Sequence, residues 1–231
     1  MLVVGFPTGL FVANCYVVAP SAGQHCVVID PGQDAVPGLT EVLREHRLKP
    51  AAVLVTHGHI DHMWSVLPVC GAHDVAAYIH GRDRGRLADP LRTLSPDLVE
   101  ALGVAGVTFG EPDDVRELTD GARLDLAGLT LMADHTPGHT EGSVVFRATG
   151  GGPDGEPLMF SGDLLFAGSI GRTDNVGGDD AAMHASLARV LTFADETVVL
   201  PGHGPSTTIG RERVTNPYLR GLPAHIREVA T

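Results

Sequence analysis

Four residues with metal-binding side chains directly follow a strongly apolar segment of the chain. Residues 51–56 read Ala-Ala-Val-Leu-Val-Thr, and such a continuous apolar run favours a strand that is buried on both faces. Residues 57–62 then read His-Gly-His-Ile-Asp-His. Open α/β sheets bind ligands at the carboxyl ends of their strands, and imidazole and carboxylate groups are common zinc ligands. The sequence therefore predicts a metal site at the end of this strand.

Three later segments each place one further ligand-type residue after an apolar run. Four ligands from one loop cannot easily surround one ion, so donors from other strand ends are expected. They are His139 after residues 129–134, Asp163 after residues 158–161 and His203 after residues 197–200. Each has a glycine as its immediate neighbour, which lets the backbone approach a site closely. The sequence thus predicts that four strand ends contribute ligands to one metal centre.

The remaining pattern predicts an α/β protein. Strands at 14–18 and 26–30, a helix at 34–48 and the strand at 51–56 form a βαβ unit. Strands dominate after residue 116, and a helix is expected at 179–191. The charged segment 81–86 is expected to be a solvated surface loop, with an anion-binding patch as the alternative. Because no composition break marks a boundary, residues 1–231 are expected to form a single domain, with 205–231 as a short C-terminal extension.

Charge and composition exclude several classes of protein. With 16 basic and 28 acidic residues the formal net charge is −12, which disfavours binding to nucleic acid or an anionic membrane. No apolar run is long enough to span a bilayer, and the first residues do not resemble a signal peptide. The 3 cysteines have no C-x-x-C spacing, as expected for buried thiols. These features predict a cytoplasmic protein.

The order of these motifs resembles that of the metallo-β-lactamase superfamily. The matching positions are His57-x-His59-x-Asp61-His62, then His139, Asp163 and His203, with Asp30 at the end of an early strand. Within that superfamily, Thr136-Pro-Gly-His-Thr140 and Gly168-Ser-Ile-Gly-Arg172 are similar to glyoxalase II. The segment Leu200-Pro-Gly-His-Gly204 is similar to the short bacterial members of that group.

This resemblance implies a fold and a ligand set. The fold would be an αββα sandwich of two mixed β-sheets flanked by helices. It would hold two divalent metal ions, with zinc the first expectation and iron or manganese as alternatives. The implied ligands are His57, His59 and His139 for the first ion and Asp61, His62 and His203 for the second, with Asp163 bridging both. Asp30 would orient a ligand or its loop, or else cap the turn before Pro31.

The resemblance also implies an activity. A hydroxide bridging the two ions would hydrolyse a hydroxyacyl thioester of a small thiol, as in hydroxyacylglutathione hydrolases. Glyoxalase II enzymes place a basic residue nine positions after the bridging aspartate to hold a substrate carboxylate, and Arg172 stands at that spacing. Arg172 could instead pair with Asp174 within its loop. The thiol carrier (glutathione, mycothiol or another), the acyl group and the oligomeric state stay open.

One alternative activity fits the same scaffold. Residues 171–174, Gly-Arg-Thr-Asp, are also similar to persulfide dioxygenases. Those enzymes use a single iron, held by the equivalents of His57, His139 and Asp163. The ligand motifs do not separate the two families, and the segment around His203 favours the hydrolase.

Overall fold

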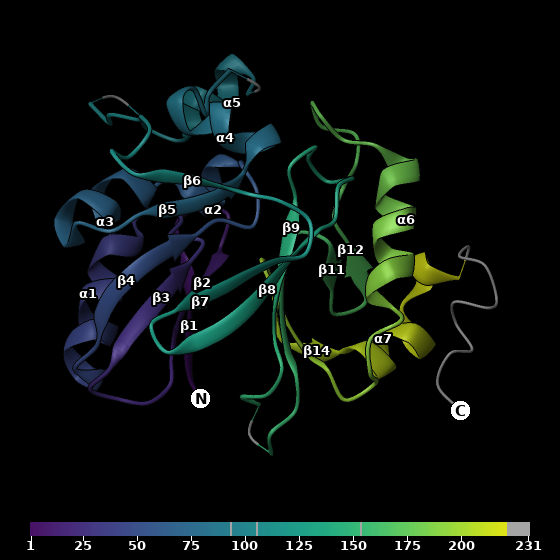
Figure 1. The fold of residues 1–231 in the computed structure, drawn as a ribbon. Coiled ribbons are helices and arrows are strands. Elements are labelled where there is room, and N and C mark those ends of the chain that lie inside the picture. The colour runs from purple at the N-terminus through teal and green to yellow at the C-terminus, as the bar shows by residue number, and fades with distance from the viewer. Residues whose placement is uncertain (93, 105, 153, 221–231) are drawn as a thin grey trace.

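Two six-stranded β-sheets lie face to face, with helices on both outer faces (Figure 1). This computed structural model describes residues 1–92, 94–104, 106–152 and 154–220, so the expected C-terminal extension is described only as far as residue 220. Both sheets contain parallel and antiparallel pairs. The predicted αββα sandwich of two mixed sheets is therefore confirmed.

The first sheet follows the order of the chain from one edge to the other. Its strands are β1 (Leu2–Thr8), β2 (Ala13–Ala19), β3 (His25–Ile29), β4 (Lys49–Leu54), β5 (Ala77–His80) and β6 (Val115–Leu118). The first three strands are antiparallel, and β3 to β6 are parallel. Helix α1 (Ala35–His46) makes the crossover from β3 to β4, so the predicted βαβ unit is present.

The second sheet has the order β14-β13-β10-β9-β8-β7. Its strands are β7 (Ala122–Leu126), β8 (Leu129–His135), β9 (Val144–Ala148), β10 (Leu158–Gly162), β13 (Val198–Pro201) and β14 (Thr207–Thr208). Only the β10–β13 pair of this sheet is parallel, so these two strands end at the same edge. A small hairpin of β11 (Leu165–Phe166) and β12 (Ser169–Ile170) follows β10.

Alternating side chains on the strands create the layers. On β2, Cys15 and Val17 point to the core under the helices, while Tyr16 and Val18 point to the core between the sheets. A third core separates the second sheet from α6 (Asp180–Val190) and α7 (Ile209–Thr215). Three apolar cores thus separate four layers, which fixes the register of each strand.

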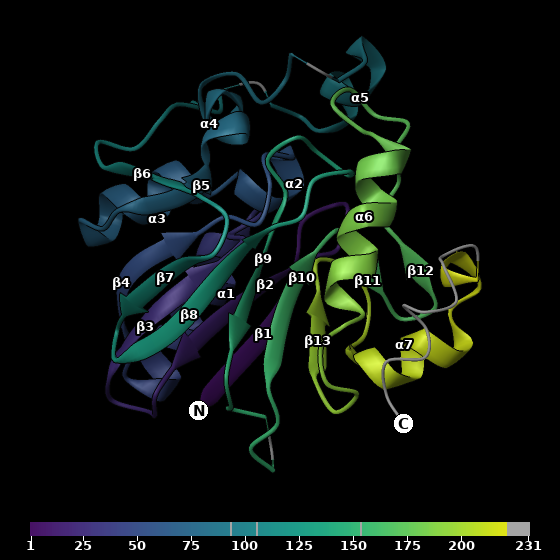
Figure 2. The ribbon, with the colours of Figure 1, turned by 45° about the vertical axis from the view of Figure 1, so that its right-hand side comes forward.

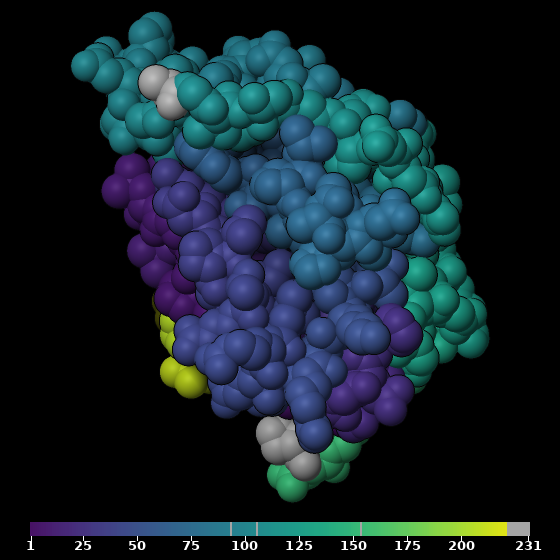
Figure 3. All heavy atoms as spheres, turned by 90° about the vertical axis from the view of Figure 1, so that its left-hand side faces the viewer, coloured from purple at the N-terminus to yellow at the C-terminus, as the bar shows by residue number. Residues whose placement is uncertain are grey.

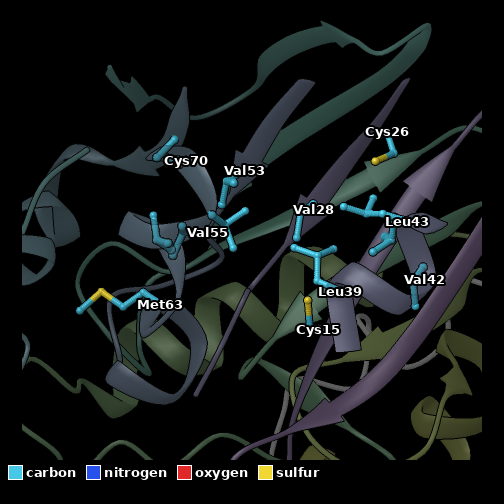
Figure 4. Packing of buried hydrophobic residues seen from close by; sticks show 14 of the residues in the cluster. Cys15, Cys26, Val28, Leu39, Val42, Leu43, Val53, Val55, Met63 and Cys70 are labelled. Carbon is cyan, nitrogen blue, oxygen red and sulfur yellow. The ribbon is translucent and has the colours of Figure 1, made fainter. Parts of the chain in front are cut away.

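Helices α1 and α3 (Val66–His73) cover the outer face of the first sheet, and Figure 3 shows that face in space-filling form. Leu39 lies on the apolar face of α1 and is directed toward Val28 and Cys15 of the sheet (Figure 4). Among the described residues, no helix combines the length and apolar character that a membrane crossing requires.

The segment 81–86 differs from its sequence prediction. It is not a solvated loop but part of helix α4 (Gly81–Ala88), in which Asp83 is 0% and Arg86 4% exposed. The prediction equated charge with exposure, whereas these two side chains have polar partners inside the protein. Helix α2 (Ile60–Met63) precedes α3 along the chain, and strand β1 was not expected.

The core between the sheets predicts a large cost for removing a central side chain. Leu131 on β8 is fully buried in that core, so Leu131→Ala should lower the free energy of unfolding by about 2–5 kcal/mol. The matched variant Leu10→Ala removes the same atoms from a side chain that is 61% exposed, and should change it by less than about 0.5 kcal/mol. Chemical denaturation of both variants measures the difference. Similar values would contradict the layer assignment.

Candidate metal centre

All seven expected ligands come together at one edge of the sandwich. Strand β4 leads into the loop with His57 and His59, and α2 carries Asp61 and His62. His139, Asp163 and His203 follow β8, β10 and β13, and Figure 2 shows β10 beside β13. Their ligand atoms form three groups that could each hold an ion: His57-His59-His139, His57-His62-Asp163 and Asp61-His62-His203.

The group of Asp61, His62 and His203 has the spacing of a metal triad. The distances are 3.5 Å from Asp61 Oδ2 to His62 Nε2, 3.2 Å from Asp61 Oδ2 to His203 Nε2, and 3.2 Å between the two Nε2 atoms. Ligands bound tetrahedrally at about 2.0–2.1 Å lie about 3.3 Å apart. The triad therefore fits a divalent ion without rearrangement.

The ring nitrogens of this triad need a cation between them. His62 donates from Nδ1 to Asp30 Oδ2 at 3.0 Å, and His203 donates from Nδ1 to the carbonyl oxygen of Phe11 at 3.1 Å. Both acceptors lack a proton to give, so both Nε2 atoms present lone pairs to each other at 3.2 Å. Either a proton or a metal ion must separate them.

The group of His57, His59 and His139 is equally convergent. His59 Nδ1 lies 2.8 Å from His139 Nε2. His139 donates from Nδ1 to the carbonyl oxygen of Arg172 at 2.8 Å, which turns Nε2 toward the group. His57 Nε2 is buried without a hydrogen-bond partner among the described residues. A buried, unpaired nitrogen is costly, and a metal ion would satisfy it.

Asp163 lies between the two groups. Its Oδ1 is 3.4 Å from His62 Nε2, and its Oδ2 is 3.5 Å from both His139 Nε2 and His203 Nε2. Oδ1 is buried and has no hydrogen-bond partner among the described residues. Gly202 is essential to this packing, because a Cβ there would overlap Oδ1. The carboxylate therefore has the position that a bridging ligand requires.

Asp30 fixes the base of the ligand loop. It is 2% exposed and accepts hydrogen bonds from Thr56 N at 2.7 Å, Thr56 Oγ1 at 2.6 Å and His62 Nδ1 at 3.0 Å. Thr56 Oγ1 also lies 3.1 Å from His57 Nδ1. Because Oγ1 donates to Asp30, it can accept from His57, which leaves His57 Nε2 free to bind a metal ion. Asp30 thus orients His62 directly and His57 through Thr56, and it also holds the end of the strand.

The electrostatics of the cluster favour cations. Burial holds the pKa of His57 well below its usual value, and the neighbouring imidazoles add to this effect. Burial also acts against protonation of His62, but Asp163, Asp61 and Asp30 outweigh it and raise the pKa of His62 to about 10. Burial would raise the pKa of Asp61, yet His62 and His203 hold it below its ordinary value. A neutral His57 and charged carboxylates form a donor set suited to a metal ion.

A pocket of about 240 Å³ opens over the cluster. His59, Asp61, His139 and Asp163 line its base. Its walls are largely apolar and come from loops, from the start of α2 and from α5 (Pro96–Ala101) with the segment before it. Helix α5 lies near the loop before α6 in Figure 2. The wall residues are Phe11, Ile60, Pro90, Leu94, Leu98, Arg172, Asn175 and Val176. The sequence prediction missed all of them except Arg172, although the uninterrupted apolar run Leu10-Phe-Val12 was a signal.

Arg172 lines this pocket and also pairs with Asp174. Its Nε and Nη2 donate to the two carboxylate oxygens of Asp174 at 2.6 and 2.7 Å. The pair is exposed, with side chains 63% and 69% accessible. Both sequence readings of Arg172 therefore remain geometrically available, because the pairing uses only one edge of the guanidinium group.

Comparison with known proteins identifies relatives over nearly the whole chain. The family model described as "Metallo-beta-lactamase superfamily" matches residues 8–203. An uncharacterized protein of Mycobacterium tuberculosis is 49% identical over 96% of this chain and 99% of its own length. Hydroxyacylglutathione hydrolase GloC of Haemophilus influenzae is 30% identical over 92% of this chain and 95% of its own.

Solved structures agree with this similarity. The BLEG-1 B3 metallo-beta-lactamase has a TM-score of 0.80 and 35% identity, covering 95% of this chain and 100% of that one. TTHA1623 in a di-iron-bound form has a TM-score of 0.75 and 38% identity, covering 94% and 100%.

The geometry predicts that the chain binds two ions and that Asp163 serves both. Metal-free protein dialysed against Zn²⁺ should take up two ions per chain. Asp163→Ala should lower the occupancy of both, because its carboxylate lies between the groups, whereas His203→Ala should mainly release one. Asp125→Ala removes an exposed carboxylate on β7 and should change nothing. Elemental analysis gives the stoichiometry, and at most one ion in the unmodified protein would refute the assignment.

Proposed function

The chain belongs to the metallo-β-lactamase superfamily, and from this premise we propose that it is a metal-dependent hydrolase that cleaves a thioester of a low-molecular-weight thiol. The observation that carries the proposal is the pair of ligand groups with Asp163 between them. A single-iron dioxygenase would need only His57, His139 and Asp163, and would leave Asp61, His62 and His203 without a role. Because the ligand motifs alone do not separate the two families, the preference for hydrolysis also draws on the segment around His203 and on the similarity to GloC.

The proposed cofactors are two divalent ions, zinc in the first place. Ions in these groups would act as Lewis acids that lower the pKa of water and polarise a carbonyl group. The ligand side chains would hold these ions in a defined geometry, because Asp30 and the carbonyl oxygens of Arg172 and Phe11 fix the orientation of three imidazole rings. The apolar pocket walls would shield the reacting acyl group from bulk water.

The protein side chains offer no thiol nucleophile among the described residues. Cys15, Cys26 and Cys70 are all buried in the core between the first sheet and its helices. This arrangement supports direct hydrolysis over an acyl-enzyme route. The free thiols also support the proposed cytoplasmic location.

Two features support a thioester as substrate. GloC, a hydroxyacylglutathione hydrolase, shares 30% of its residues over nearly the full chain, and Arg172 stands on the pocket wall where it could meet a remote polar group. The proposed partner is thus a small-molecule thioester. The net charge of −12 weighs against nucleic acid and anionic membranes.

The test is a substrate panel on protein of known metal content. Hydroxyacyl thioesters of several small thiols, a thiol persulfide and a β-lactam are compared by kcat/KM. We expect thioester cleavage to be fastest, to be lost on chelation and to return with Zn²⁺. Oxygen uptake with the persulfide, or a higher kcat/KM for the β-lactam than for the thioesters, would contradict the proposal.

Arg172 gives a sharper prediction about the substrate. If it binds a substrate carboxylate, Arg172→Ala loses a charge-assisted hydrogen bond of about 1.5–3 kcal/mol, or roughly 10- to 150-fold in kcat/KM, without loss of metal. Arg172→Lys should recover only part, because lysine lacks the planar fork. Asp174→Asn removes the competing carboxylate and should raise kcat/KM for the same substrate. Equal losses for substrates with and without a carboxylate would assign Arg172 a purely structural role.

A further inference from the structure

Helix α4 carries a buried carboxylate that touches two ligand loops at once. Asp83 is 0% exposed. Its Oδ2 accepts hydrogen bonds from Gly58 N at 2.7 Å and from Thr140 Oγ1 at 2.6 Å, and its Oδ1 accepts from Gly142 N at 3.1 Å. Gly58 lies between His57 and His59, and Thr140 is the neighbour of His139. One side chain thus connects the two segments that supply the whole His57-His59-His139 group.

We propose that Asp83 is a positioning residue that sets the separation of these two loops and thereby the affinity of the His57-His59-His139 group for its ion. The inference rests on the metal dependence in the proposed function, and not on the choice of substrate. A ligand loop that shifts by a fraction of an ångström changes metal–ligand distances, which tolerate only small deviations. The carboxylate is hydrogen-bonded to both loops and is not among the residues that line the pocket.

Glycine residues in both ligand loops allow close packing against Asp83. A Cβ on Gly142 would lie 2.6 Å from Asp83 Cγ, and a Cβ on Gly58 would lie 3.1 Å from Asp83 Cβ and 2.5 Å from Arg86 Cδ. The contacts of 2.6 Å and 2.5 Å are shorter than real Cβ atoms make, and the contact of 3.1 Å is tight. Glycine at both positions is what allows the two loops to lie directly against α4.

The charge of Asp83 is also compensated locally. Arg86 Nε lies 3.5 Å from Asp83 Oδ1, and both side chains are almost completely buried. Arg86 Nη2 also donates to the carbonyl oxygen of Val176 on the pocket wall at 3.0 Å. Three donors and one cation therefore surround a carboxylate, whereas an amide would turn its NH₂ group toward one of these donors. Asparagine at position 83 would therefore keep the shape of the side chain and lose its match to the surrounding donors.

The contacts are selective for one ligand group. Within the described part of the chain, the hydrogen bonds of Asp83 go to the segments of His57, His59 and His139, while His62 is oriented by Asp30. Loss of Asp83 should therefore weaken one ion and spare the other. A residue that only stabilised the fold would not produce this asymmetry.

The experiment measures two metal affinities in Asp83→Asn. Metal-free protein is titrated with Zn²⁺ against a chromophoric chelator. We expect one ion to bind about 10- to 100-fold more weakly, the usual effect of losing a ligand-orienting partner, and the other to change by less than about threefold. In a His203→Ala background, which retains the His57-His59-His139 group, the remaining ion should weaken by the same factor.

Two further variants complete the design. Asp134→Asn is the matched control, because Asp134 is 2% exposed and ion-paired with Arg147 and Arg189 on β9 and α6. It should lower stability and leave both affinities unchanged. Thr140→Val removes one hydrogen bond of Asp83, together with the contact of Thr140 Oγ1 with Ser143 Oγ at 2.8 Å, and keeps the shape of the side chain. It should weaken the same ion by a smaller factor. It keeps the test valid if Asp83→Asn does not fold.

The outcomes separate the inference from the proposed function. Equal weakening of both ions, or affinities in Asp83→Asn and Thr140→Val that match those of Asp134→Asn, would overturn the role of Asp83 and leave the hydrolase proposal intact. Selective weakening in a protein that cleaves no thioester would support the role of Asp83 and overturn the substrate class. A wild-type protein that binds no Zn²⁺ would overturn both.

Discussion

The metal centre depends on carboxylates that are buried beneath it and accept several hydrogen bonds each. Asp30 illustrates the constraint, because it adopts a left-handed backbone (φ 50°) and binds both Thr56 and His62. Removing a carboxylate from water costs several kcal/mol unless donors replace the lost hydration. Here the donors belong to the strand end and to a ligand side chain. The same hydrogen bonds therefore compensate Asp30 for the water that it loses on burial and orient the His62 ring.

The arrangement couples metal affinity to folding. Asp30, Asp61 and Asp163 surround His62 in a nearly dry environment, and they raise its pKa to about 10. A metal ion held by His62 and His203 would replace that proton between two nitrogens that face each other at 3.2 Å. The unfolded chain has no such preformed cluster, so binding stabilises the folded state by mass action. A bound ion would consequently stabilise this edge of the sandwich as well as contribute to its chemistry.

The sequence was sufficient to predict that the seven candidate ligands come together, and insufficient to predict their surroundings. His139, Asp163 and His203 could be predicted because each follows an apolar strand and has a glycine neighbour, a local pattern. The role of Asp83 could not be predicted, because nothing in the charged segment 81–86 indicates that backbone N–H groups from distant parts of the chain will donate to its buried carboxylate. The residues of the pocket wall could not be predicted for a related reason. Phe11 and Leu98 are far apart in the chain and meet only through the tertiary fold.

The charge distribution restricts how a substrate would reach the centre. The chain carries a net charge of −12, so an anionic substrate would be repelled at long range and would meet attraction only near a bound metal ion. Arg172 adds little to that attraction while Asp174 neutralises it. Its free edge becomes effective only at contact distance, where a planar carboxylate or an amide oxygen can take its hydrogen bonds. Binding would then draw mainly on apolar contacts with the walls, and Arg172 would select among substrates already in the pocket rather than draw them into it.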